Sequence, residues 1–371
     1  MKLMIKVISV FGTRPEAIKM APLVKKLSVE ENIQSKVIVT AQHREMLDQV
    51  LELFEIKPDY DLDIMKQGQT LTGVTTRVLN GLEEIFATEK PDIVLVHGDT
   101  TTTFTAALAA FYQKIAVGHV EAGLRTFNKY SPYPEEMNRR LTGSITDLHF
   151  APTDTSMDNL LGENILREKI SVTGNTVIDA LLDTVEKTFP METILPDIDW
   201  NKRIILLTAH RRENWGEPLK NIFLAAKEIV TDFPDTELIF PVHKNPKVSQ
   251  LAHELLGDMN RIHLIGPLDY LPFVKLMSRS HLVLTDSGGM QEEAPSLGKP
   301  VLVLRETTER PEAVQAGTVK MVGTAKDDVY QAAADLLKND QAYKEMAHAV
   351  NPYGDGKASD RIIEIIKKYF N

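Results

Sequence analysis

The amino-acid sequence predicts an α/β protein with two similar domains, each an open, doubly wound parallel sheet of the Rossmann-like kind. Short β-branched runs alternate with longer helical patterns along all 371 residues, as repeated βαβ units require. The length fits two or three domains of about 100–200 residues each. Apolar residues make up 43% of the chain and charged residues 25%, which is typical of a globular protein and excludes disordered and coiled-coil chains.

Short runs rich in valine, isoleucine and leucine mark the expected strands, and helical patterns fill the gaps. The clearest helix shows one apolar stripe formed by Ala17, Met20, Ala21, Val24 and Leu27. The expected strands are Lys6–Phe11, Lys36–Thr40, Ile93–His97, Ile115–Val120, Leu148–Ala151 and Ile170–Thr173, then Arg203–Thr208, Leu238–Val242, Ile262–Ile265, Leu282–Thr285 and Val301–Leu304.

A change of pattern between residues 187 and 202 predicts a linker, because this stretch carries prolines and acids and has no consistent period. We expect residues 1–187 and 188–358 to form the two domains, with a cleft between them. Ligands of open parallel sheets bind beyond the carboxyl ends of the strands. The loops that follow strands are therefore where functional residues are expected.

Composition also limits the function. The chain has no cysteine, which excludes disulfides, thiolate nucleophiles and cysteine-based metal sites. A net charge of −10 argues against a nucleic-acid partner, which would need clustered lysine and arginine. Lys6 interrupts the apolar N-terminus, and no apolar run approaches the ~20 residues of a spanning helix. We expect a cytoplasmic protein without a membrane partner.

The first strand leads into a candidate anion site. Thr13 and Glu16 fit a capping box at a helix start, with Arg14 beside it and Lys19 off the apolar stripe. A helix N-terminus with two cations suits a phosphate or a carboxylate. The alternative is a capped helix with solvated basic residues.

Two carboxylates follow neighbouring strand candidates, Asp99 after His97 and Glu121 after Val120. Such a pair can serve as acid and base, because mutual repulsion moves one pKa toward the working pH. On local grounds Asp99 also fits the N-cap of a helix over Thr100–Tyr112, whereas Glu121 has no local explanation.

The polar residues at the same strand ends could instead form a metal site. His97, Asp99, His119 and Glu121 resemble a ligand set, which keeps a metal-dependent hydrolase in view. The spacing argues weakly against it, since no HExxH, zinc-finger or EF-hand pattern occurs. We expect neither a metal nor another cofactor.

A third carboxylate and a cation come from the helix predicted after Pro134. Glu135 and Arg139 project into the cleft in the functional interpretation. In the structural one, Glu135 contacts Arg139 at i,i+4 and pairs with the helix dipole.

In the second half, the strand before Thr208 is followed by His210, Arg211 and Arg212. Such a cationic loop would be satisfied by an anionic ligand, or by acids of the protein alone.

The most specific single pattern is an apolar strand that runs into Ser287, Gly288 and Gly289 and then a helix. Glycines let backbone N–H groups approach a diphosphate, and the carboxylates one turn later could accept bonds from ribose hydroxyls. Neither a GxGxxG fingerprint nor a Walker motif is present, which disfavours dehydrogenases and P-loop kinases.

Together these motifs resemble the non-hydrolysing bacterial UDP-N-acetylglucosamine 2-epimerases, in family order and over almost the whole chain. The matching blocks are Phe-Gly-Thr-Arg-Pro-Glu from Phe11, His-Gly-Asp-Thr from His97, His-Val-Glu-Ala-Gly-Leu-Arg-Thr from His119, Pro-Glu-Glu from Pro134, His-Arg-Arg-Glu-Asn from His210, Thr-Asp-Ser-Gly-Gly-Met-Gln-Glu-Glu from Thr285 and Thr-Thr-Glu-Arg-Pro-Glu from Thr307.

The resemblance implies the GT-B architecture, a C-terminal helix over residues 359–371 that crosses back to the first domain, and a homodimer. It implies reversible conversion of UDP-GlcNAc to UDP-ManNAc, for cell-wall or capsule polymers, by elimination of UDP to 2-acetamidoglucal and re-addition. Residues carried over by motif are Asp99, Glu121 and Glu135 as acid/base groups with Lys19, Arg139 and His210 assisting; Arg14, His210, Ser287, Gly288 and Gly289 for the diphosphate; Glu293 for the ribose; Phe273 for the uracil; and Arg310 for the sugar or phosphate.

Activated family members bind UDP-GlcNAc at a second, regulatory site. The matching positions here are Gln42, His43, Gln69, Arg211 and His243, while Gly68 stands where many activated members have arginine. A hydrolysing epimerase that releases ManNAc, a GT-B glycosyltransferase and a non-catalytic nucleotide-sugar sensor are the alternatives that activity measurements would separate.

Overall fold

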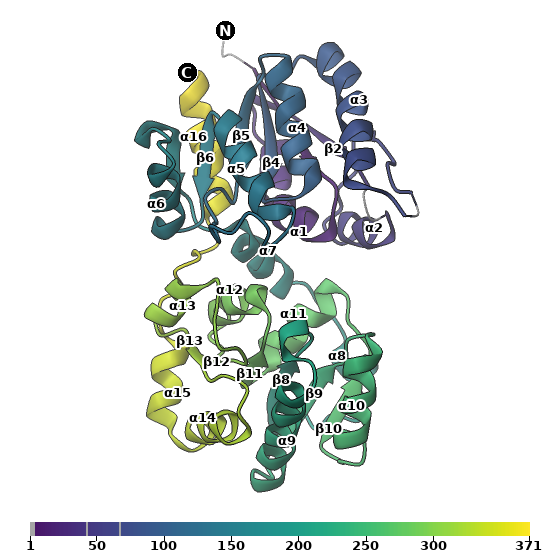
Figure 1. The fold of residues 1–371 in the computed structure, drawn as a ribbon, viewed down its shortest axis with the longest axis vertical. Helices are drawn as coiled ribbons and strands as arrows, with labels where there is room; N and C mark the ends of the chain where they lie inside the picture. Colours follow the sequence, from purple (N-terminus) through teal and green to yellow (C-terminus); the bar gives the residue numbers. More distant parts are fainter. Residues whose placement is uncertain (1–3, 42–43, 67) are drawn as a thin grey trace. The chain divides into compact units, whose positions relative to one another are not determined.

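The computed structural model describes residues 4–41, 44–66 and 68–371, which fold as two compact units (Figure 1). The first unit comprises Met1–Asp183 and Tyr353–Asn371, and the second comprises Thr184–Pro352. Each unit holds one sheet in which every strand pairing is parallel. The predicted α/β class with two parallel sheets is confirmed.

The first sheet has the order β3-β2-β1-β4-β5-β6-β7, so the chain builds outward from β1 in one direction and then from β4 in the other. The boundary between β1 and β4 is therefore the switch point, where open α/β sheets bind ligands. The strands are β1 (Ile5–Phe11), β2 (Ile33–Val39), β3 (Tyr60–Asp61), β4 (Ile93–His97), β5 (Ala116–Val120), β6 (Leu148–Ala151) and β7 (Ile170–Val172).

The second sheet repeats this plan in the order β10-β9-β8-β11-β12-β13, with its switch point between β8 and β11. Its strands are β8 (Arg203–Thr208), β9 (Thr236–Pro241), β10 (Ile262–Ile265), β11 (Leu282–Thr285), β12 (Val301–Val303) and β13 (Val319–Met321).

Every strand predicted from the sequence is present, with ends shifted by a few residues at most. The prediction missed two edge strands, β3 and β13. They span only two and three residues, respectively, which is too short for an apolar run to stand out.

The helices of the first unit pack in two groups, α1 with α2 and α16, and α3 with α4 and α5. The predicted stripe on α1 is wholly buried. Over the described residues, no helix combines the length and apolar character required to span a membrane. The helices are α1 (Arg14–Ser28), α2 (Arg44–Leu53), α3 (Leu71–Glu89), α4 (Thr101–Tyr112), α5 (Glu135–Ile145), α6 (Asp154–Gly162), α7 (Thr176–Val185) and α16 (Ala358–Phe370).

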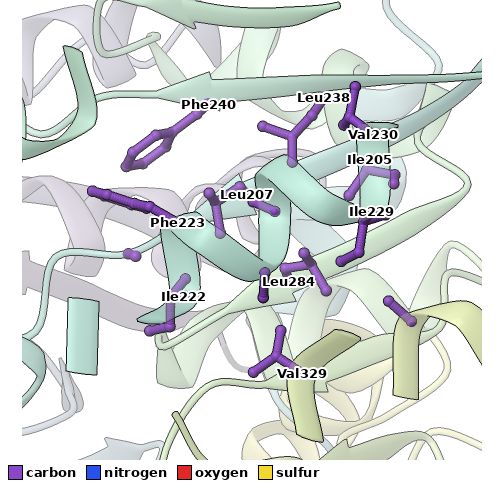
Figure 2. Close-up of a cluster of buried hydrophobic side chains, with 14 of the residues drawn as sticks. Ile205, Leu207, Ile222, Phe223, Ile229, Val230, Leu238, Phe240, Leu284 and Val329 are labelled. Carbon is purple, nitrogen blue, oxygen red and sulfur yellow. The ribbon is translucent and has the colours of Figure 1, made fainter. Parts of the chain in front are cut away.

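In the second unit, α9 packs against α10 and α14, and its apolar face covers the central strands (Figure 2). Phe223 of α9 and Phe240 of β9 meet there with ring centroids 5.4 Å apart. The helices are α8 (Met191–Ile194), α9 (Glu217–Asp232), α10 (Pro246–Leu256), α11 (Tyr270–Arg279), α12 (Gly288–Ser296), α13 (Pro311–Gln315), α14 (Lys326–Lys338) and α15 (Asp340–Ala347).

The division between the units lies at Asp183/Thr184 rather than at the expected 187/188. The stretch expected to be a linker is packed, since Met191, Leu195 and Ile198 are buried. Its proline-rich composition therefore reflects a folded connection of the second unit.

The return to the first unit begins at Tyr353, before the expected residue 359, because Tyr353 is itself buried. The helix α16 that follows packs against α1. Its start is held by the carboxylate of Asp179, which accepts the backbone N–H of Ser359 at 2.8 Å and that of Ala358 at 3.2 Å. Burial raises the pKa of Asp179, whereas these bonds lower it.

Candidate active site

The loops that follow β1, β4 and β5 bring their residues together at the switch point of the first sheet. In the parallel register, His97 lies opposite Val120, so the residues just beyond these two strand ends are neighbours. Gly98 and Glu121 occupy those positions. The sequence placed both carboxylates at strand ends, and the strand order makes those ends adjacent.

Glu121 is the most tightly held of the predicted acid/base residues. Its side chain is 7% exposed. One carboxylate oxygen, Oε1, contacts Lys19 Nζ and accepts a hydrogen bond from Asn175 Nδ2 at 2.9 Å. The other, Oε2, lies 3.4 Å from His97 Nε2. The backbone of Glu121 is left-handed, with φ 62°, which is uncommon for a residue other than glycine and concentrates at functional sites.

Gly98 makes room for this carboxylate. Its φ is +68°, and a Cβ at this position would lie 3.3 Å from Glu121 Oε2. A side chain here would be strained and would press on the carboxylate. The His-Gly-Asp-Thr motif therefore needs glycine at this position, both for the left-handed backbone and for the space that the carboxylate occupies.

His97 and His119 are arranged differently from metal ligands. His97 faces Glu121, whereas His119 Nε2 lies 2.7 Å from the backbone oxygen of Gly98. Among the residues that the structure describes, no group of three or more histidine, aspartate or glutamate side chains could hold a metal ion.

Three neighbouring strands each carry a buried histidine, His97, His119 and His149, that is neutral in the folded protein. Burial, the largest cause, lowers their pKa values from 6.5 to about 3, about 4 and about 3, respectively. Because the unfolded chain binds these protons more readily, their contribution to stability is complete above about pH 6.5 and is lost as the pH falls. Three such groups lower the free energy of unfolding by up to ~4 kcal/mol per pH unit.

We expect unfolding of His149→Gln to take up about one proton fewer than unfolding of the wild type. The free energy of unfolding should then depend less steeply on pH, by about 1.4 kcal/mol per pH unit between roughly pH 5.5 and 4.5. Any polar mismatch of the buried glutamine is independent of pH, so the slope is what reports the effect. Urea titrations at several pH values, followed by circular dichroism, measure it. The exposed His253 supplies the control His253→Gln. Equal slopes for wild type and His149→Gln would contradict the assignment.

Asp99 is held by the start of α5. Arg139 Nη2 donates to Asp99 Oδ2 at 2.5 Å, and Asn138 Nδ2 donates to the backbone oxygen of Asp99 at 2.9 Å. The suggestion that Asp99 caps the following helix is wrong, because Thr100 is the N-cap and accepts the N–H of Thr103. Asp99 is thereby left to pair with Arg139.

The expected i,i+4 pairing of Glu135 with Arg139 is also wrong. Arg139 pairs at i,i+3 with Glu136, with Nη1 to Oε2 at 3.3 Å. Glu136 is fully buried and accepts the N–H groups of Thr126 and Phe127 at 3.0 and 3.1 Å, respectively. Glu136 thus fixes the loop before α5, whereas Glu135 is half-buried in the first turn of that helix.

The first loop has the predicted capping box. Glu16, buried, accepts the N–H groups of Thr13 at 2.8 Å and Gly12 at 3.1 Å, and burial raises its pKa. A Cβ on Gly12 would lie 1.9 Å from Thr40 Oγ1, so only glycine fits. Arg14 begins α1 directly after this loop, and Lys19 follows on the same helix.

The second unit repeats the pattern at its own switch point. Asp286, which follows β11 and is completely buried, accepts the N–H groups of His210 at 2.9 Å and Arg211 at 2.8 Å, and the amide of Asn214 at 3.1 Å. This one carboxylate shapes the loop after β8. The sequence analysis missed it, although an aspartate directly after an apolar strand was the available signal.

Asp286 also faces the ring of His210, with Oδ1 3.3 Å from Nδ1. Burial is the main cause that lowers the pKa of His210, whereas the negative charge of Asp286 raises it. The ring stacks on His243 with centroids 5.7 Å apart, and the His210 side chain is 41% exposed. Asp286 and His243 therefore orient the ring of His210, whose side chain stays partly exposed.

The N-terminus of α12 fits the predicted anion site. Ser287 is its N-cap, and a Cβ added to Gly288 would lie 3.7 Å from Arg211 Nη2, so the guanidinium lies beside the helix start. One turn later, Tyr270 donates its hydroxyl to Glu293 Oε2 at 3.4 Å.

A cavity of about 270 Å³ joins these residues within the second unit. It is lined by both histidines, by Ser287 and Glu293, and by Phe273, so polar and apolar groups both face it. Arg310 is held next to the same helix by the buried carboxylate of Glu292.

The regulatory candidates fall into three groups. Gln42 and His43 lie outside the described residues. Gln69 accepts a hydrogen bond from Arg77 at 2.8 Å in the first unit. Arg211 and His243 belong to the second unit. Gly68 has φ +67°, a conformation that favours glycine over arginine.

Comparison with known proteins shows the family of this chain. The family model for UDP-N-acetylglucosamine 2-epimerase matches residues 25–367. The UDP-N-acetylglucosamine 2-epimerase of Bacillus subtilis is 60% identical over 97% of this chain and 94% of its own, and that of Escherichia coli K12 is 57% identical over 98% of each.

The crystal structure of UDP-GlcNAc 2-epimerase from Neisseria meningitidis, bound to UDP-GlcNAc, superposes with a TM-score of 0.89 at 56% identity and covers 98% of this chain and 100% of that one. The fold is therefore of the GT-B class predicted from the motifs. This protein therefore belongs to the UDP-N-acetylglucosamine 2-epimerase family.

Proposed function

We propose that this protein interconverts UDP-GlcNAc and UDP-ManNAc by inverting C2 of the sugar without a cofactor. The observation that carries the proposal is Glu121, a buried carboxylate in strained backbone that Lys19 and Asn175 hold at a sheet switch point. Relatives at 57–60% identity carry the corresponding name.

Elimination explains why carboxylates are needed. The C2–H bond is not next to a carbonyl, so direct removal of its proton faces a very large barrier. If the C1–O bond breaks first, its electron pair leaves with UDP, and positive charge at C1 acidifies C2–H. A carboxylate then takes the proton, the C–H electrons form the C1=C2 bond of 2-acetamidoglucal, and UDP is free.

Re-addition reverses these steps on the other face. A carboxylic acid gives a proton to C2, the double bond supplies the electrons, and a phosphate oxygen of UDP attacks C1. Two faces need two acid/base groups, and the candidates are Glu121, Asp99 and Glu135. Lys19 and Arg139, which contact Glu121 and Asp99 respectively, assist by stabilising the carboxylate forms.

Most of the groups proposed to bind the nucleotide belong to the second unit. The start of α12 at Ser287 and Gly288, together with His210 and Arg14, supplies N–H groups and cations for the diphosphate. Glu293 would hold the ribose, and Phe273 would cover the uracil in the cavity described above. Approach of the diphosphate should raise the proton affinity of His210, so that an imidazolium between Asp286 and the phosphate balances the departing charge.

The test is to incubate the purified protein with UDP-GlcNAc in deuterium oxide and follow it by proton NMR. We expect UDP-ManNAc to form and both nucleotide sugars to carry deuterium at C2, with no net UDP. Accumulation of ManNAc and UDP would replace the proposal by the hydrolysing reaction. Recovery of unlabelled UDP-GlcNAc alone would reject it.

The homodimer, the activation by UDP-GlcNAc and the supply of cell-wall or capsule polymers stay predictions, as does the cytoplasmic location.

A further inference from the structure

Asn175 connects three parts of the first unit. Its side-chain Nδ2 donates to Glu121 Oε1 at 2.9 Å. Its Oδ1 accepts the N–H of Val177, in the first turn of α7, at 3.1 Å. Its backbone N–H donates to the oxygen of Tyr353 at 2.7 Å. The residue is 2% exposed, so these bonds are shielded from water.

This position is special in the path of the chain. Asn175 directly precedes α7, and the chain leaves the first unit near the end of that helix, at Asp183/Thr184. The chain returns at Tyr353, the residue whose oxygen Asn175 binds. Asn175 therefore contacts the segment by which the chain returns, and it precedes the helix near whose far end the chain leaves.

The segment by which the chain returns to the first unit, residues 353–359, packs closely against the backbone next to Asn175. Gly174 has φ +85° and Gly354 has φ +135°, and a Cβ on Gly174 would lie 3.3 Å from the Cα of Gly354. The Tyr353 side chain is buried beside them, and Asp179 fixes the start of α16 a few residues later. Displacement of residues 353–359 would therefore also displace the backbone of Asn175.

We propose that Asn175 is a positioning residue, which orients the carboxylate of Glu121 and ties it to the segment by which the chain re-enters the first unit. The inference rests on the proposed function, because it assigns Glu121 an acid/base role. A hydrogen bond to Oε1 favours the ionised carboxylate and fixes the direction of Oε2. A shift of the returning segment would move Asn175, and it would thereby alter both the ionisation of Glu121 and the direction of its Oε2.

The test compares kcat, KM and the pH dependence of kcat for wild type, Asn175→Ser and Asn175→Asp. Serine retains an oxygen for the N–H of Val177 but does not reach Glu121, so the start of α7 is preserved. We expect Asn175→Ser to lower kcat about 10- to 100-fold with little change in KM, and to move the acidic limb of the profile upward by about one pH unit. Asn175→Asp adds a like charge and should move that limb further.

Coupling to the returning segment is tested by Asp179→Asn, which weakens the hold on α16 without touching Glu121. We expect a smaller shift of the same limb in the same direction, and no additional shift when Asp179→Asn is added to Asn175→Ser. Thermal unfolding of each variant checks that the fold is kept.

The outcomes are distinct. Active wild type with an unchanged kcat and pH profile in Asn175→Ser would overturn the positioning role alone. Additive shifts in the double variant would overturn the coupling. A wild-type protein that does not exchange the C2 hydrogen would overturn the proposed function and this inference with it.

Discussion

Glu121→Gln is expected to slow exchange of the C2 hydrogen about 1,000-fold while UDP binding stays within a few-fold of wild type. Glutamine matches the size of glutamate but its amide does not accept a proton from carbon. Lys19 would also lose its carboxylate partner. The groups expected to bind uridine diphosphate belong mainly to the second unit, so the loss should appear in kcat rather than in affinity.

Deuterium incorporation at C2 and calorimetry with UDP measure the two effects separately. A control is Glu163→Gln, which also removes a paired carboxylate of the first unit, one that binds Arg125 and Arg140. It should retain near wild-type exchange. An exchange rate in Glu121→Gln within about tenfold of wild type would show that another group removes the proton.

Asp286→Ala is expected to weaken UDP binding about 100-fold, although Asp286 lies under the loop and not on its surface. The substitution leaves the N–H groups of His210 and Arg211 and the amide of Asn214 without their common acceptor. Each unpaired buried donor costs about 1–3 kcal/mol. We expect the loop to rearrange and to move His210 and Arg211 away from the start of α12.

Calorimetric titration with UDP tests this expectation, and circular dichroism shows whether the second unit remains folded. The matched control is Asp258→Ala, which removes an exposed carboxylate of the same unit. UDP affinity equal to wild type in a folded Asp286→Ala protein would show that the loop does not depend on Asp286.

The sequence was informative where a single segment determines the structure. Buried parallel strands are continuous apolar runs, so β4 or β8 could be recognised without their partners. The capping box of Thr13 and Glu16 is likewise local, and it is present as predicted. Glu121 directly follows β5, so its place at a strand end could be predicted for the same reason.

The sequence was uninformative where distant segments meet. Lys19 and Glu121 are 102 residues apart, and their contact depends on the strand order β1-β4-β5, which no local pattern specifies. Asn175 and Asp286 were missed because their importance lies in the groups they bind and not in their type. Helical spacing predicted an ion pair of Arg139 with Glu135, but in the structure Arg139 pairs with Asp99 and Glu136.

Breakage of the C1–O bond is the central claim of the proposed reaction, and isotope scrambling tests it most directly. UDP-GlcNAc is prepared with oxygen-18 in the bridge between C1 and the β-phosphorus, and the label is followed by phosphorus NMR. Free UDP rotates about its β-phosphoryl group before re-adding, so we expect the label to spread into non-bridging positions of both recovered nucleotide sugars. Formation of UDP-ManNAc with all of the label still in the bridge would contradict elimination.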